Sequence, residues 1–183
     1  MEQNHYERAR QMNRAGGECL EKGDFEGAIE NFSKALEFLP EDQLESKARL
    51  HNNKGHVQVR LKRYDDALSS FKQAAEAYDK LGNQVLLGEQ FGNIGSVYRD
   101  TEQWEAALEN YSKSLAIFTK IGHKKGVADQ CSNVGYAHFR QGQVESAFRF
   151  FQKAKILYDE VGEDKKSQLC DHNLQAVKSY LEK

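Results

Sequence analysis

Four asparagines recur along the chain at intervals of forty residues: Asn53, Asn93, Asn133 and Asn173. Asparagine is a mediocre helix former, so helix propensity does not explain its recurrence. Its side-chain amide carries both a donor and an acceptor, which match the C=O and N–H groups of an extended peptide. We therefore predict that these amides bind a peptide main chain. The alternative is that each asparagine hydrogen-bonds a neighbouring repeat and pins the stacking.

Catalytic and metal-binding motifs are absent from the sequence. It contains no H-E-x-x-H, C-x-x-C, Walker loop, G-x-S-x-G or G-x-G-x-x-G pattern. The six histidines and three cysteines lack the spacing of metal ligands. We expect Cys19, Cys131 and Cys170 to be small apolar fillers between helices, and Trp104 and Tyr111 to be core residues. The sequence predicts neither an enzyme nor a bound cofactor or metal.

Composition and charge narrow the class of partner. The balance of 26 basic and 28 acidic residues gives a net charge of −2, which offers no general attraction for nucleic acid or anionic lipid. The N-terminus lacks the basic start and apolar run of a signal peptide, and no apolar stretch approaches the length of a membrane span. Three widely spaced cysteines fit reduced thiols in a cytoplasm better than disulfides. We expect a cytoplasmic protein with no membrane insertion.

The asparagines belong to a repeat that runs through the chain. Gly16, Gly55, Gly95 and Gly135 are spaced by 39, 40 and 40 residues, and the same offsets from each carry similar residues. Twelve residues on stand Ala28, Ala67, Ala107 and Ala147; sixteen on, Phe32, Phe71, Tyr111 and Phe151; nineteen on, Ala35, Ala74, Ser114 and Ala154. Small residues beside a large ring, at helical spacing, predict two closely packed antiparallel helices in each unit.

The ends of these helices carry their own signals. Gly82, Gly122 and Gly162 stand where a left-handed C-cap would end the second helix, and the first unit ends differently, at Pro40. We expect the turns within the hairpins at residues 22–24, 62–63, 102–103 and 142–143. The last segment repeats only a first helix, and its apolar face contains Cys170, Leu174, Val177 and Leu181. It is predicted to be a terminal cap.

This register of glycine, aromatic and alanine positions resembles that of tetratricopeptide repeat (TPR) proteins. The forty-residue unit, with Gly-Asn-Ile-Gly at residues 92–95, resembles those of Pins-type spindle-orientation scaffolds, kinesin light chains and bacterial peptide-sensing regulators. The resemblance implies an all-α, right-handed α-solenoid of four TPR-like hairpins and a C-terminal capping helix. We expect a single domain over residues 1–183, with repeats at about 9–40, 48–82, 88–122 and 128–162 and the cap at about 165–182. One departure is His51, which stands where a large apolar residue is expected.

In the TPR arrangement the first helices of successive hairpins line a concave groove. The resemblance places on this groove the four asparagines together with Arg49, Arg60, Arg99, Arg140, His56, Tyr136 and Phe139. The arginines would pair with acidic side chains of a peptide. Alternatively, four acids on the same groove neutralise the arginines within the protein: Glu21, Glu89, Asp100 and Asp129. Tyr136 and Phe139 would hold an anchor side chain, or else pack beneath the cap.

The predicted function is a non-enzymatic protein-interaction module that binds an extended, acid-containing peptide in its groove. Two alternatives stay open: a self-assembling homo-oligomeric scaffold and a regulatory subunit of a separate enzyme. A co-chaperone role is disfavoured. The positions equivalent to the carboxylate clamp of chaperone-binding TPR domains are Asn13, Gly17, Asn53, Glu89 and Asn93, and only Asn53 matches that clamp.

Overall fold

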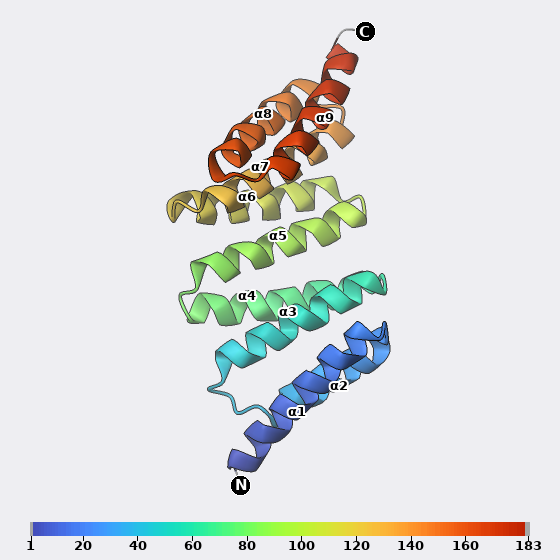
Figure 1. The fold of residues 1–183 in the computed structure, drawn as a ribbon, viewed down its shortest axis with the longest axis vertical. Coiled ribbons are helices and arrows are strands. Elements are labelled where there is room, and N and C mark those ends of the chain that lie inside the picture. Colours follow the sequence, from blue (N-terminus) through green and yellow to red (C-terminus); the bar gives the residue numbers. More distant parts are fainter. Residues whose placement is uncertain (1, 182–183) are drawn as a thin grey trace. The chain divides into compact units, whose positions relative to one another are not determined.

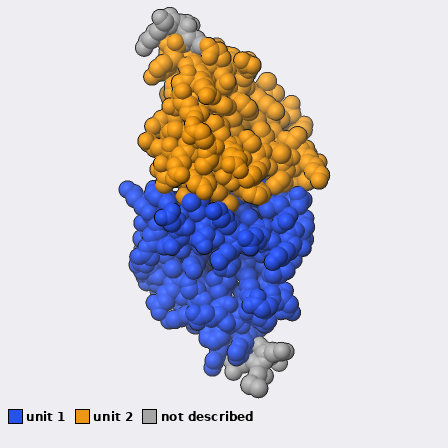
Figure 2. Space-filling view, turned by 180° about the vertical axis from the view of Figure 1, so that it is seen from behind, with its two compact units in different colours: residues 1–90 blue, residues 91–183 orange. Residues whose placement is uncertain are grey.

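A computed structural model describes residues 2–181, which form nine α-helices and no strand (Figure 1). The helices are α1 (Glu2–Glu21), α2 (Phe25–Phe38), α3 (Leu44–Arg60), α4 (Tyr64–Lys80), α5 (Gln84–Asp100), α6 (Trp104–Lys120), α7 (Lys124–Arg140), α8 (Val144–Val161) and α9 (Asp164–Leu181). The predicted all-α, helical-repeat class is confirmed. The chain divides into two compact units, residues 1–90 and 91–183 (Figure 2), and each is described by itself below. The single domain expected from the sequence stays a prediction.

Hairpins are closed by an aromatic ring that lies against a glycine of the partner helix. A Cβ atom added to Gly16, Gly55 or Gly95 would stand 2.5–2.6 Å from the ring sixteen residues on, and one added to Gly135 would stand 3.0 Å away. The four rings are almost fully buried: Phe32, Phe71, Tyr111 and Phe151. No side chain larger than hydrogen fits between helix and ring without displacing one of them. The predicted close approach of the two helices is confirmed.

The turns follow the predicted positions, but two of them lack glycine. Lys62 and Glu102 adopt left-handed backbone conformations, with φ of 59° and 57°. Their counterparts in the other hairpins are glycines, Gly23 and Gly142, with φ of 75° and 74°. The left-handed C-caps at Gly82, Gly122 and Gly162 are also present.

The connection between α2 and α3 has a different geometry from the other connections. After α2 ends at Phe38, Leu39 turns to an extended conformation with φ −81° and ψ 129°, as favoured for a residue before proline. Residues 39–43 then lead to α3. Leu39 itself stays buried in the core of the first hairpin and α3.

The capping helix α9 buries the predicted apolar face. Cys170, Leu174 and Val177 are at most 9% exposed and belong to core clusters shared with α7 and α8. The side chain of Leu181, the fourth member of that face, lies outside the described residues. Cys131 lies in the same cluster as Cys170, and Cys19 packs against the core of the first hairpin, as expected of apolar fillers.

The two aromatic residues expected in the core differ in their burial. Tyr111 is fully buried, whereas Trp104, at the start of α6, is only half-buried. The Trp104 prediction was therefore too strong, because its indole lies at the rim of the hairpin, where Arg140 covers it with the guanidinium 4.9 Å from the ring centroid.

His51 in α3 is a half-buried polar residue whose hydrogen-bonding capacity is not fully satisfied. Its Nδ1 atom is buried and has no hydrogen-bond partner among the described residues. Burial, assisted by the positive charges of Lys54 and Lys47, lowers the pKa of His51 from 6.5 to about 4. The ring is therefore neutral at pH 7, and a proton can be added only at a cost to the folded state.

Adjacent glycines in α1 provide a matched test of the contact between ring and glycine. Gly16→Ala places a methyl group 2.5 Å from the buried Phe32 ring, so we expect it to lower the free energy of unfolding by about 1–3 kcal/mol. A methyl group added at Gly17 would meet nothing within 4 Å, so Gly17→Ala should raise it by about 0.5–1 kcal/mol through helix propensity. Urea denaturation of both variants measures the difference. If both substitutions changed the free energy of unfolding by the same amount and in the same direction, the contact between ring and glycine would not determine the helix spacing.

His51 predicts a loss of stability in mild acid. The pKa is near 6.5 in the unfolded chain and about 4 in the folded one, so stability is complete above pH 6.5 and is lost as the pH falls toward 4. Between about pH 7 and pH 4.5, the wild type should lose about 1–2 kcal/mol more unfolding free energy than His51→Leu, allowing for partial exposure of the ring. His172→Gln, at an exposed histidine, is the control. The same pH slope in all three proteins would contradict this account of His51.

Candidate peptide-binding site

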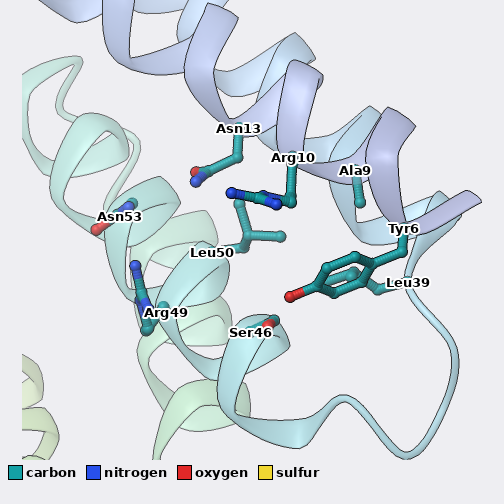
Figure 3. A pocket seen from close by; sticks show the side chains of 9 residues that line it. All are labelled: Tyr6, Ala9, Arg10, Asn13, Leu39, Ser46, Arg49, Leu50 and Asn53. Carbon is teal, nitrogen blue, oxygen red and sulfur yellow. The ribbon is translucent and has the colours of Figure 1, made fainter. Parts of the chain in front are cut away.

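The first unit contains a cavity of about 520 Å³ between α1 and α3 (Figure 3). Nine residues line it: Tyr6, Ala9, Arg10 and Asn13 from α1, Leu39 from the connection, and Ser46, Arg49, Leu50 and Asn53 from α3. Two predicted groove residues, Arg49 and Asn53, are thus brought together. A volume of several hundred cubic ångströms is typical of a ligand site.

Helical periodicity gathers these side chains. Tyr6, Arg10 and Asn13 follow one another by four and three residues and so share one face of α1. Ser46, Arg49 and Asn53 share one face of α3 for the same reason. Below them, the floor is formed by residues of the hydrophobic core, which holds both helices in place: Ala9, Leu39 and Leu50.

The polar groups of this pocket are largely unused by the protein. Within residues 2–181, the side-chain amides of Asn13 and Asn53 form no hydrogen bond, and Arg49 forms no ion pair. Arg10 approaches one carboxylate, that of Glu7, at 3.6 Å between Nη1 and Oε1, and both side chains are more than half exposed. An exposed pair of this kind contributes little and is easily exchanged for a ligand.

His56 lies further along α3 and does not line the pocket. Its ring packs edge-on against Phe71, with centroids 5.2 Å apart. Although the residue is exposed overall, this contact removes water from the ring, and together with the charge of Arg60 it lowers the pKa of His56.

The second unit contains a smaller hollow of about 270 Å³ at the corresponding register. Asn133 lines it together with Asp129, Ser132, Tyr158, Lys166 and Leu169. Asp129 is occupied within the protein, because its Oδ1 atom accepts hydrogen bonds from Tyr158 at 2.7 Å and from Lys166 at 2.6 Å. Burial and the bond to Asp129 raise the pKa of Tyr158. A lysine, rather than one of the predicted arginines, thus neutralises this acid.

Three of the predicted arginines make contacts inside their own units. Arg99 donates to Oδ1 of the neighbouring Asp100 at 3.0 and 2.8 Å. Arg60 lies over the ring of Phe25, 5.7 Å from its centroid. Arg140 covers Trp104 and donates to the Tyr136 hydroxyl at 3.0 Å and to Glu102 at 3.2 Å. Arg99 is thus neutralised by Asp100 within the protein, as the alternative interpretation of the groove arginines expected.

The predicted aromatic pair is divided between two environments. Phe139 packs beneath the cap, where its ring meets Tyr180 edge-on with centroids 5.3 Å apart. Tyr136 is 38% exposed and faces Trp104, at 6.3 Å between ring centroids. The two rings therefore do not form a single anchor pocket.

The remaining asparagines differ in their surroundings. The side chains of Asn133 and Asn173 are half-buried and form no hydrogen bond within the described residues, whereas Asn93 is engaged within the protein. Pinning of the stacking is thus not the role of every asparagine in the column.

Two pocket residues, Tyr6 and Ser46, were missed from the sequence. Tyr6 stands four residues before Arg10, and Ser46 three residues before Arg49, so each lies one helical turn before an arginine on the same face of its helix. Extending the groove face of each first helix by a turn would have found both.

Two further site types were sought across residues 2–181. No group of three or more His, Cys, Asp or Glu side chains gathers there as metal ligands would. No helix in that range combines the length and apolar character that crossing a membrane requires.

Comparison with solved structures shows the fold. The apo form of RapI matches with a TM-score of 0.82 and 17% identity, over 96% of this chain and 69% of that one. Aspartyl phosphate phosphatase F from Bacillus subtilis matches with a TM-score of 0.81 and 17% identity, over 97% of this chain and half of that one. BtubC (BKLC) from P. vanneervenii matches with a TM-score of 0.68 and 16% identity, over 99% and 89%.

Sequence comparison identifies the family. No curated protein matches the chain. The tetratricopeptide repeat family matches it in three overlapping stretches, residues 7–80, 46–120 and 90–154. These stretches contain all four glycine origins and the aromatic rings packed against them. By this match and by its helical hairpins, the chain belongs to the tetratricopeptide repeat family.

Proposed function

We propose that this TPR protein binds an extended, acid-containing peptide on the face formed by its first helices. Membership of the family supports a protein-interaction module. The peptide and its acidic character are inferred from the pocket in residues 1–90. The proposal rests on one observation: asparagine amides and arginine guanidiniums that the described part of the protein leaves largely unpaired line the same cavity.

Asn13 and Asn53 would bind the peptide main chain. Each amide offers a donor and an acceptor, and the half-buried position of both residues removes part of the competing water. Asn133 and Asn173 offer the same groups in the second unit, where Asn133 lines the smaller hollow. Contacts of this kind hold a backbone largely without regard to its sequence.

Arg10 and Arg49 would supply the preference for acids. Guanidinium groups bind carboxylates through two parallel hydrogen bonds, and no carboxylate side chain lines this cavity among the described residues. We therefore propose that Arg10 and Arg49 bind the acidic side chains of the peptide. The other predicted arginines already make contacts inside the protein: Arg60, Arg99 and Arg140.

Selection from a displayed library of short random peptides tests this function. Peptides captured by the wild type should be enriched in Asp and Glu, and their affinity should fall by about tenfold in Asn53→Ala and in Arg49→Gln, since each removes one hydrogen bond to the ligand or more. Fluorescence anisotropy with labelled winners measures both effects, and added salt should weaken binding.

Lys34→Gln is the matched control, because it also removes one positive charge. Lys34 lies on α2, pairs with Glu30 at 2.6 Å and does not line the cavity. Its replacement should leave peptide affinity unchanged. Selected peptides without acid enrichment, or winners that bind the Asn53 and Arg49 variants as tightly as the wild type, would refute the proposed function.

A further inference from the structure

The polar lining of the cavity in residues 1–90 combines cations with neutral amide and hydroxyl groups, all of which can donate hydrogen bonds. Arg10 and Arg49 contribute two positive charges, Asn13 and Asn53 contribute amides, and hydroxyl groups come from Tyr6 and Ser46 (Figure 3). No Asp or Glu is among the described residues that line it. The lining therefore carries two formal positive charges, which favour an anionic ligand.

Carboxylates near the pocket do not cancel this charge. Glu7 lies 3.6 Å from Arg10, but both groups are exposed and the distance exceeds that of a hydrogen bond. Glu45 and Glu89, like Arg49, are close enough to Tyr78 to shift its pKa. Neither glutamate lines the cavity. Arg49 forms no ion pair with any described residue.

The paired cations are not a requirement of the repeat. In the second unit, the residue at the register of Arg10 is Asp129, which lies six positions before Gly135 as Arg10 lies six before Gly16. That acid is neutralised internally by Lys166. In the second unit, the charges at this register therefore neutralise each other. In the first unit the two arginines lack such a partner inside the cavity, so they are available to a ligand.

We propose that this pocket binds the phosphate group of a phosphorylated side chain. The inference rests on the proposed peptide-binding function and names the residue that the peptide presents there. A phosphate monoester carries a charge of about −1.5 to −2 at pH 7 and three acceptor oxygens. Two guanidiniums, each binding two oxygens, balance that charge, and the amides and hydroxyl groups supply the remaining donors. A carboxylate, with one charge and two oxygens, leaves one arginine uncompensated.

Inorganic phosphate and acetate are the first probes, titrated against the full chain by calorimetry. Phosphate should bind at least about tenfold more tightly than acetate, and Arg10→Gln or Arg49→Gln should weaken phosphate binding by about tenfold. Lys34→Gln should not. Because the second ionisation of a phosphate monoester lies near pH 6, the affinity of a phosphoserine peptide should rise between about pH 5 and pH 7, whereas a carboxylate ligand shows no such rise. Circular dichroism verifies that the variants are folded.

Three peptides of one sequence, carrying phosphoserine, glutamate or serine at a single position, separate this inference from the proposed function. The phosphoserine peptide should bind most tightly, and its advantage should vanish in Arg49→Gln. Equal binding of the phosphoserine and glutamate peptides would overturn the phosphate assignment and leave peptide binding intact. If the chain binds phosphate but none of the three peptides, the phosphate site is supported and the proposed peptide-binding function is contradicted.

Discussion

An aromatic ring lying on a glycine determines how close the two helices of each hairpin approach. Phe32, Phe71, Tyr111 and Phe151 each occupy space that a methyl group on the opposing helix would need. Alanines twelve residues from each glycine are completely buried beside these contacts. Since the interior is close-packed, neither the ring nor the glycine can change size without moving a helix. The spacing of the helices, and hence the alignment of the polar faces they present, depends on this contact.

The candidate site lies where the repeat departs from regularity. Between α2 and α3, a tight left-handed turn is replaced by the extended Leu39 and Pro40, and Leu39 becomes part of the pocket floor. The first turns of α1 add Tyr6 to the wall. Regular stacking alone therefore produces the hollow around Asn133, whereas an irregular connection accompanies the larger cavity around Asn53.

Much of the architecture was predictable because buried positions allow few residue types. The glycine, alanine and ring columns identified the hairpins, and Gly23 and Gly142 marked the column in which Lys62 and Glu102 also turn left-handed. Long charged side chains were less predictable, because exposed arginines choose among several partners of similar energy. The sequence pattern put Arg140 and Asp129 on the groove, but only coordinates show that one covers Trp104 and that the other accepts from Lys166.

All nine residues of the larger cavity lie within residues 1–90. Repeats of this kind contact mainly their neighbours, so substitutions in one hairpin leave distant hairpins unperturbed. Residues 91–183 can therefore diverge in sequence without altering the side chains of α1 and α3 that line this cavity. Under the proposed function, one half of the chain is free to evolve while the chemistry of recognition in the other half is retained.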